Sequence, residues 1–360
     1  MAATCSRDSC SAAPCPRRIS KTCWPSPSPP SATKKCAPPF PGKALFCHPL
    51  PMRKALLRTV ASLLLVALVF TFADPPRLLQ ALGHPDPGWL LAGFVASSCA
   101  VLSGALRWQQ LARWLEMEAP TKLFLLAQWR GMAANTVMPG AVLGGDALRT
   151  LHLQRAGNPL GSAAVSVALD RISGLWVLVV ISLSISALAL ACGLLPPQAL
   201  PLPWPLVALL ALAALAAPPA LWLLSSASRH HLPRKLAGLL DAIHARPHPL
   251  RQYGIQLFGS AAVQTFFIIA FSCGGRAVGL ELPLWLFFIA AGPIFILAAT
   301  PVSVGGWGTR EAASALVLGL LGAPKELAVA TAVLYGLFAA LQGLLGAATL
   351  FPWKKSKTPA

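Results

Sequence analysis

The sequence is short of charged residues, and this shortage decides its class. Asp, Glu, Lys and Arg make up 11% of the 360 residues, whereas soluble domains carry about 25%. Hydrophobic residues make up 56%, and long apolar runs recur along the chain. A separate soluble catalytic domain does not fit between these runs. We therefore predict an all-α integral membrane protein, a polytopic helical bundle with any chemistry inside the bilayer or at its surface.

Signatures of catalysis and metal binding are missing as well. The sequence has no HExxH or GxSxG motif and no multi-carboxylate metal cluster, and its cysteine spacings match no CxxC zinc pattern. A membrane-embedded enzyme acting on a lipid linkage is thus the least favoured of three hypotheses. We predict no catalytic residue, no metal site and no cofactor.

Acidic residues number only 11 against 29 basic ones, a net charge of +18. Basic residues lie mostly in the first 51 residues and near the ends of apolar segments, and no nucleic-acid-binding motif accompanies them. This distribution is typical of membrane orientation and of contact with anionic lipid head groups. No nucleic-acid partner is expected.

The chain is predicted to have three parts. Residues 1–51 are rich in Pro and Ser, hold six of the nine cysteines and lack an apolar run, so we expect a disordered extension and no signal peptide. Met52, which opens "MRKALLRTVASLLLVALVF", is an alternative start of translation. Residues 52–353 form the transmembrane domain, and residues 354–360 form a short basic cytoplasmic tail.

Six segments are predicted to cross the membrane completely, with a loop at 74–87 after the first. Residues 107–122 form a basic amphipathic link after the second, with Trp108 and Trp114 suited to the membrane interface. The six segments lie at about 55–73, 88–106, 160–194, 204–224, 254–273 and 326–351.

Two more apolar segments, 123–147 and 283–322, are interrupted by Pro and Gly and are predicted to be re-entrant hairpins. With both termini in the cytoplasm, the basic links at 107–122 and 225–253 lie inside, provided that the first hairpin enters and leaves on the cytoplasmic side. The second hairpin then enters from the outer side. The two hairpins form an inverted repeat, a pattern that indicates a binding site near the middle of a transporter membrane domain.

The two interruptions share their spacing. The first reads "NTVMPGAVLGGDALRT" (135–150) and the second "TPVSVGGWGTRE" (300–311), and in each an arginine follows the second glycine by four residues with an acid close by. The matching residues are Pro139, Gly144, Gly145, Asp146 and Arg149 in the first, and Pro301, Gly305, Gly306, Arg310 and Glu311 in the second.

This pattern predicts a receptor for an anion. The glycines allow turns with positive φ and let the chain approach another group closely, and helices restarting at about 146 and 309 present free N–H groups and a positive dipole end. Arg149 and Arg310, in the first turns, add a planar fork that suits phosphate. Either break alone is better explained as a loop with a local ion pair; the matched spacing favours a site.

Other polar residues support this site or leave it open. Asn135 is expected to cap or hydrogen-bond the broken backbone. Arg130 either faces the same cavity or lies at the membrane interface, and its closeness to Asn135 favours the cavity. The pair Asp170–Arg171 has two interpretations of equal weight: an intramembrane pair lining the cavity, or an interfacial pair before the helix begins.

These residues together resemble a known family. Asn135 through Arg149, Ser166 four residues before Asp170–Arg171, and "PVSVGGWGTRE" are similar to the flippase-like membrane region of the lysylphosphatidylglycerol synthases, over residues 52–351. Family members often have Glu-Arg at the position of Asp170–Arg171. The resemblance implies an inner-membrane protein of bacteria that handles or translocates a lipid. No soluble aminoacyl-transferase domain is expected after "FPWKKSKTPA", so a stand-alone member is expected.

Two functions remain in view. The first is binding and translocation of an anionic lipid, a phospholipid or an isoprenoid phosphate, with its phosphate held by Arg149 and Arg310. Asp146, Asp170 and Glu311 would orient the arginines or take up protons. The alternative is a non-catalytic membrane subunit that supports a separate glycosyl- or aminoacyl-transferase. The partners are then anionic membrane lipids or that transferase, and the oligomeric state is left open.

Overall fold

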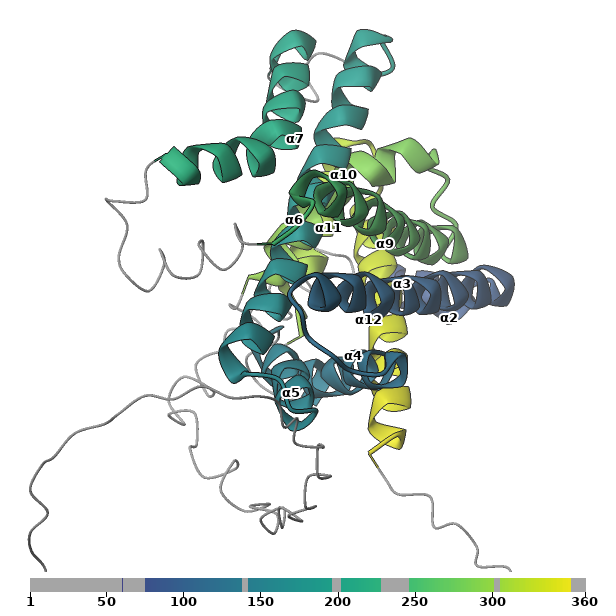
Figure 1. Ribbon diagram of the computed structural model, residues 1–360. Helices are drawn as coiled ribbons and strands as arrows, with labels where there is room; N and C mark the ends of the chain where they lie inside the picture. Colours follow the sequence, from purple (N-terminus) through teal and green to yellow (C-terminus); the bar gives the residue numbers. More distant parts are fainter. Residues whose placement is uncertain are drawn as a thin grey trace, which may run out of the picture. The chain divides into compact units, whose positions relative to one another are not determined.

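The computed structural model describes residues 60, 75–137, 142–195, 202–227, 246–300 and 305–350. The chain divides into two units, Met1–Pro49 and Leu50–Ala360, and all described residues belong to the second. These residues form ten α-helices and no strand (Figure 1), which confirms the all-helical class. The predicted extension at 1–51, nearly all of the span at 55–73, the tail at 354–360, Pro139 and Pro301 lie outside the described residues.

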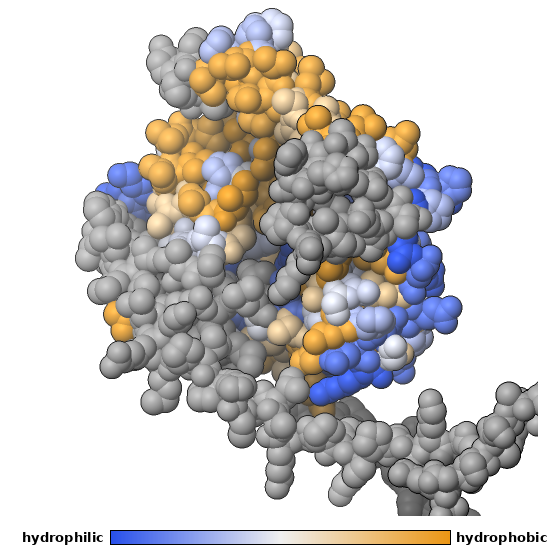
Figure 2. Space-filling view, turned by 60° about the vertical axis from the view of Figure 1, so that its left-hand side comes forward, coloured by the Kyte–Doolittle hydropathy of each residue, from blue (hydrophilic) through white to orange (hydrophobic). Residues whose placement is uncertain are grey.

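Five helices are long and apolar enough to cross a membrane, so the protein is a multi-pass membrane protein. Their positions confirm the five predicted spans that fall on described residues. The helices are α3 (Pro87–Trp114), α6 (Leu160–Ala191), α7 (Trp204–Ala227), α9 (Pro249–Ala277) and α12 (Lys325–Ala348). On the face seen in Figure 2, hydrophobic residues cover the upper part, at the height of α7 in Figure 1.

The two interrupted segments form two pairs of shorter helices. The first pair is α4 (Thr121–Val137) and α5 (Val142–Arg155), and the second is α10 (Leu284–Ala299) and α11 (Thr309–Leu320). The helices of each pair pack against each other, and α12 contacts both α4 and α11. Both predicted breaks are therefore real, while their depth in the membrane and the inverted repeat remain predictions.

The first break differs from the prediction at its helix start. Helix α5 begins at Val142, four residues before the expected position, so Gly144 and Gly145 are helical and have no positive φ. Gly145 serves close packing instead, because a Cβ there would clash with the backbone oxygen of Gly131 and the side chain of Asn135. The prediction of positive φ was wrong at this break, whereas the predicted close approach is confirmed by the contact between α4 and α5.

Two further predictions about segment ends were wrong. The expected loop after the first span contains α2 (Pro75–Gly83), whose prolines occupy the first helical positions, where no N–H is needed. Its Leu78 is buried against α9 and α12. Helix α3 runs on to Trp114, and Trp108, expected at the interface, is fully buried beside Phe124. The polar residues near position 107 do not end the helix because partners inside the bundle satisfy them.

The contact between α4 and α5 can be tested at Gly145. We expect Gly145→Ala to lower the free energy of unfolding by about 1–3 kcal/mol, the usual cost of overpacking a tight contact. Gly161→Ala in α6 is the control, because a Cβ there meets nothing within 4 Å and should be neutral or slightly stabilising. Thermal unfolding in detergent measures both, and an equal effect of the two variants would contradict the packing role.

Candidate functional site

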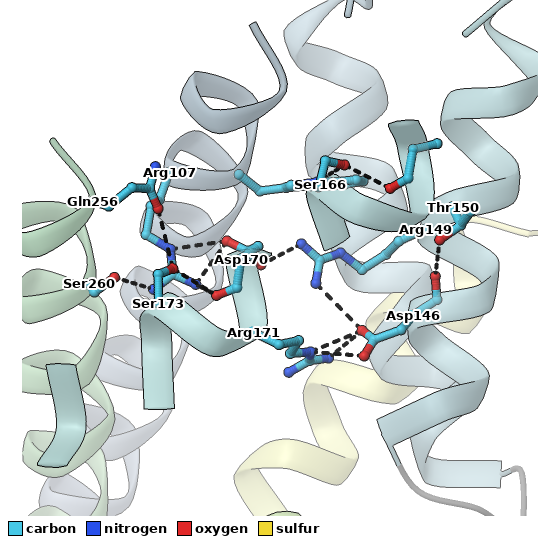
Figure 3. A network of polar contacts seen from close by, with 12 residues as sticks. Arg107, Asp146, Arg149, Thr150, Ser166, Asp170, Arg171, Ser173, Gln256 and Ser260 are labelled. Atoms are coloured by element: carbon cyan, nitrogen blue, oxygen red, sulfur yellow. Dashed lines mark hydrogen bonds and ion pairs between the residues drawn. The ribbon is translucent and has the colours of Figure 1, made fainter. Parts of the chain in front are cut away.

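A buried carboxylate lies at the centre of the polar residues. Asp170 is on the apolar helix α6 and is 3% exposed. Arg107 of α3 donates to its Oδ1 from Nε at 3.0 Å and from Nη2 at 2.9 Å, and Arg149 of α5 donates to Oδ2 at 2.7 Å (Figure 3). Asp170 is therefore buried within α6, which begins at Leu160, so the interpretation that the helix begins after the pair Asp170–Arg171 was wrong. The depth of the pair in the membrane stays a prediction.

Arg107 is fixed by three helices. Besides Asp170, it donates to Ser260 Oγ of α9 at 2.8 Å. Its side chain fits because the neighbouring helices present glycines: a Cβ on Gly174 or on Gly259 would lie 3.3 Å or 3.2 Å from Arg107 atoms. The sequence therefore leaves room for one arginine between α3, α6 and α9.

Arg149 is an internal support and is not presented to an open site. Its side chain is 2% exposed, its guanidinium carbon lies 4.1 Å from the centre of the Trp108 ring, and its Nη1 is 3.6 Å from Asp146. Because α5 begins at Val142, Arg149 is in the second turn, and the prediction that it lies in the first turn was wrong. Its Nε has no hydrogen-bond partner among the described residues.

The network reaches partial exposure at Arg171. Its Nε donates to both oxygens of Asp146 at 2.9 and 3.2 Å, and its side chain is 39% exposed. The sequence-predicted residues Asp146, Arg149, Asp170 and Arg171 are thus brought together with Arg107 in a chain of alternating charge (Figure 3). Three arginines and two aspartates leave an excess of one positive charge, and Arg171 is its most exposed member.

The second break agrees with the prediction in its backbone. Gly305, Gly306 and Gly308 have φ of 61°, 79° and 86°, a region that side chains strain to reach. Helix α11 then begins at Thr309, as expected.

The positive end of α11 is already occupied by an anion of the protein itself. Glu311 accepts from the Gly308 N–H at 2.5 Å through Oε2, and its Oε1 accepts from Nε and Nη2 of Arg310 at 3.1 and 2.6 Å. Both side chains are 5% exposed. Among the described residues, no hydrogen bond uses Nη1 of Arg310. Through these hydrogen bonds Glu311 orients the guanidinium of Arg310, which is one of the two roles predicted for it.

Asn135 connects the two breaks. Its Oδ1 accepts from the Gly145 N–H at 2.8 Å, and its backbone oxygen lies 3.6 Å from where a Cβ of Gly305 would be. Beside it is a cavity of about 170 Å³ lined by residues of α4, the second break and α12, among them Asn135, Gly305, Gly306, Trp307 and Arg310.

Arg130 does not line this cavity. It donates to Thr349 through Nε to Oγ1 at 3.1 Å and through Nη2 to the backbone oxygen at 2.7 Å. Thr349 is the C-cap of α12, so Arg130 satisfies the free carbonyl end of that helix, where a positive charge is favourable. Closeness in sequence to Asn135 was a misleading signal, because the two side chains leave α4 in different directions.

Arg107 is the residue that sequence reasoning missed. It was assigned to an interfacial link, although it continues a buried face of small residues with helical spacing, namely Gly93, Ala96, Ala100 and Gly104. That periodicity was the available signal, together with the need of a buried Asp170 for a cation.

The dependence of the network on Asp170 is testable. We expect Asp170→Asn to lower the free energy of unfolding by roughly 3–5 kcal/mol, because it leaves buried arginines without a counter-charge. Adding Arg107→Leu should recover part of the loss.

Asp86→Asn is the matched control, because this exposed N-cap accepts from Gly88 and Trp89 through Oδ1, which asparagine replaces well. Chemical unfolding in detergent compares the variants. A tolerated Asp170→Asn would show that the network does not hold the helices together.

The family described as "Lysylphosphatidylglycerol synthase TM region" matches residues 55–346, which include both breaks and the whole charged network. No curated protein matches the chain. Because the match covers most of its length, the chain belongs to the family of lysylphosphatidylglycerol synthase TM regions.

Proposed function

We propose that this protein binds an anionic membrane lipid by its phosphate head group and translocates it between the leaflets, without catalysing a reaction. The lipid is a phospholipid or an isoprenoid phosphate. The observation that carries the proposal is that both helix breaks meet at Asn135, beside a cavity that Arg310 lines. Irregular backbone at membrane depth persists where it is buried in protein or lines a polar cavity.

The size of the cavity favours a head group over a whole lipid. Pockets for drug-sized ligands measure about 300–1,000 Å³, and this one measures about 170 Å³. It therefore accommodates a phosphate, while the hydrocarbon chains remain outside in the bilayer.

The chemistry for holding a phosphate is present but occupied by Glu311. Its carboxylate accepts from the Arg310 guanidinium and from the Gly308 N–H, both of which are donors that phosphate oxygens use. A bound phosphate would replace this carboxylate, and the cost of leaving Glu311 unpaired would make binding reversible. Reversible binding is what transport requires.

The charged network supports movement of an anion. Its excess positive charge is most exposed at Arg171, whose partner Asp146 follows Gly145, the residue bonded to Asn135. The anion site and the network are therefore joined through adjacent residues of α5. We assign the protein to the bacterial inner membrane because of its family, and we place both termini in the cytoplasm because of the distribution of basic residues.

The test removes the charges of the cavity as a neutral pair. Arg310→Gln with Glu311→Gln leaves no buried charge unpaired, and we expect it to slow translocation by about tenfold to a hundredfold, since charge-assisted hydrogen bonds contribute roughly 1.5–3 kcal/mol. The measurement is the transfer of a fluorescent phosphatidylglycerol across proteoliposomes of phosphatidylcholine and phosphatidylglycerol, followed by external quenching.

The control removes another ion pair, Arg246→Gln with Glu116→Gln, which bond each other away from the cavity. This control variant has the same net charge as the unmodified protein and should translocate the lipid at the same rate. A folded Arg310–Glu311 variant that matches this control would refute the head-group role of the cavity.

A second function is favoured by the family alone. The match is to the membrane region of a synthase, so the chain could instead act as a membrane subunit for a separate glycosyl- or aminoacyl-transferase. Purified protein that moves no lipid in proteoliposomes, but moves or modifies lipid once a transferase is added, would support this alternative over the first.

A further inference from the structure

A second, larger cavity lies away from Asn135. It is a groove of about 730 Å³ between the end of α3, α6, α7 and the start of α9. Its walls are mainly apolar and include Leu169, Ile172, Trp176, Pro218 and Trp222. Neither the network nor the head-group cavity uses these walls.

The groove follows a bend in α7 that other helices hold in place. Pro218 and Pro219 lie inside α7, which changes direction in Figure 1. Each proline lacks the N–H that would bond the carbonyl four residues earlier, so Ala214 and Leu215 lose their helical donors. Trp176 Nε1 donates to Ala214 O at 2.6 Å, and Tyr253 Oη donates to Leu215 O at 2.7 Å. The bend is thus fixed from α6 and from α9.

One end of the groove carries polar groups without partners. Gln252 and Gln256 of α9 line the groove and are each 7% exposed. The Nε2 atom of each has no hydrogen-bond partner among the described residues, while Gln256 Oε1 accepts from Ser173 at 3.3 Å. A buried amide without a partner costs free energy, so these donors indicate an acceptor supplied from outside the chain.

The same end of the groove is basic. His248 and Arg251 line it, and α9 begins there at Pro249 with an N-cap residue whose side chain makes no capping bond. Amide donors, an arginine and a helix N-terminus together favour oxygen atoms that carry negative charge. The remaining length of the groove favours hydrocarbon.

We propose that this groove is a second lipid-binding site, which takes one hydrocarbon chain along α6 and α7 and the phosphate of the same anionic lipid at Gln252 and Arg251. The occupant is a membrane lipid because the groove matches an amphiphile: oxygen-binding donors at one end and apolar walls along the rest. The proposal rests on the proposed function for the class of lipid, but places it at a site separate from the Arg310 cavity.

The experiment uses photoactivatable phosphatidylglycerol, with a diazirine on its acyl chain, in phosphatidylcholine vesicles that contain the full-length protein. Labelled peptides are identified by mass spectrometry. We expect labelling of α7 around residues 218–223 and of the facing part of α6, and weaker labelling by a diazirine phosphatidylcholine. Equal labelling by both lipids, or labelling confined to other helices, would overturn the proposal.

Two variants sharpen the result. Ile172→Trp fills the groove and should abolish most of the labelling, whereas Leu188→Trp on the same helix should not. The two side chains are 61% and 60% exposed, and only Ile172 lines the groove. Gln252→Leu should lower phosphatidylglycerol labelling by about fivefold, the effect of one hydrogen bond. Equal labelling of the two tryptophan variants would refute the site. If a variant does not fold, the labelled peptides of the unmodified protein test the proposal by themselves.

The Arg310→Gln, Glu311→Gln variant separates this proposal from the proposed function. It should keep groove labelling while its translocation is slowed. If translocation depends on Arg310 but the groove is not labelled, the second site alone is refuted. If the groove is labelled but the rate of translocation does not depend on Arg310, the head-group cavity alone is refuted.

Discussion

The carboxylate of Asp170, held between two arginines inside an apolar helix, is the interaction on which the arrangement of the helices depends. Arg107 brings α3 to it and, through Ser260, α9; Arg149 brings α5. These three charged side chains are buried, so none can replace its partner by water unless the helices separate. Such a network contributes little net stability compared with an apolar core. What it provides is a single permitted arrangement of α3, α5, α6 and α9, because any other leaves a charge unpaired.

The two helix breaks differ because this network fixes one of them and not the other. Helix α5 is held by Arg149 and by the close contact of Gly145 with α4, so the first break is rigid on its α5 side. The second break has three glycines with positive φ and a charge pair formed by adjacent residues, Arg310 and Glu311. Among the described residues, neither side chain forms an ion pair with another helix. A site that must release its ligand is better placed at the second break, since its charges can exchange partners without breaking an ion pair between helices.

The sequence predicts what is local and fails where packing decides. Five spans follow from apolar length, and the start of α11 follows from glycine spacing, because both depend on neighbouring residues alone. Arg149 and Asp170 could be named as important, but their pairing could not, since it depends on which faces of α5 and α6 meet. Arg107 was missed for the same reason. Arg130 was placed at the cavity, while the carbonyl end of α12, more than two hundred residues later in the chain, is what binds it.

Helix α6 relates the two proposed lipid sites to each other. At one side, Ser173 donates both to the backbone oxygen of Asp170 and to Gln256 in the groove. At the other, Arg171 binds Asp146, next to the glycine that Asn135 holds at the head-group cavity. The charged network is therefore connected to both sites, through Ser173 on the side of the groove and through Asp146 on the side of the cavity. If an anionic head group occupies the groove and later the cavity, Arg171 is the member of the network best exposed to attract it. Transfer between the sites requires a positive charge that attracts the head group from either one. It also requires that this charge already has an aspartate partner, so that the head group is not held permanently.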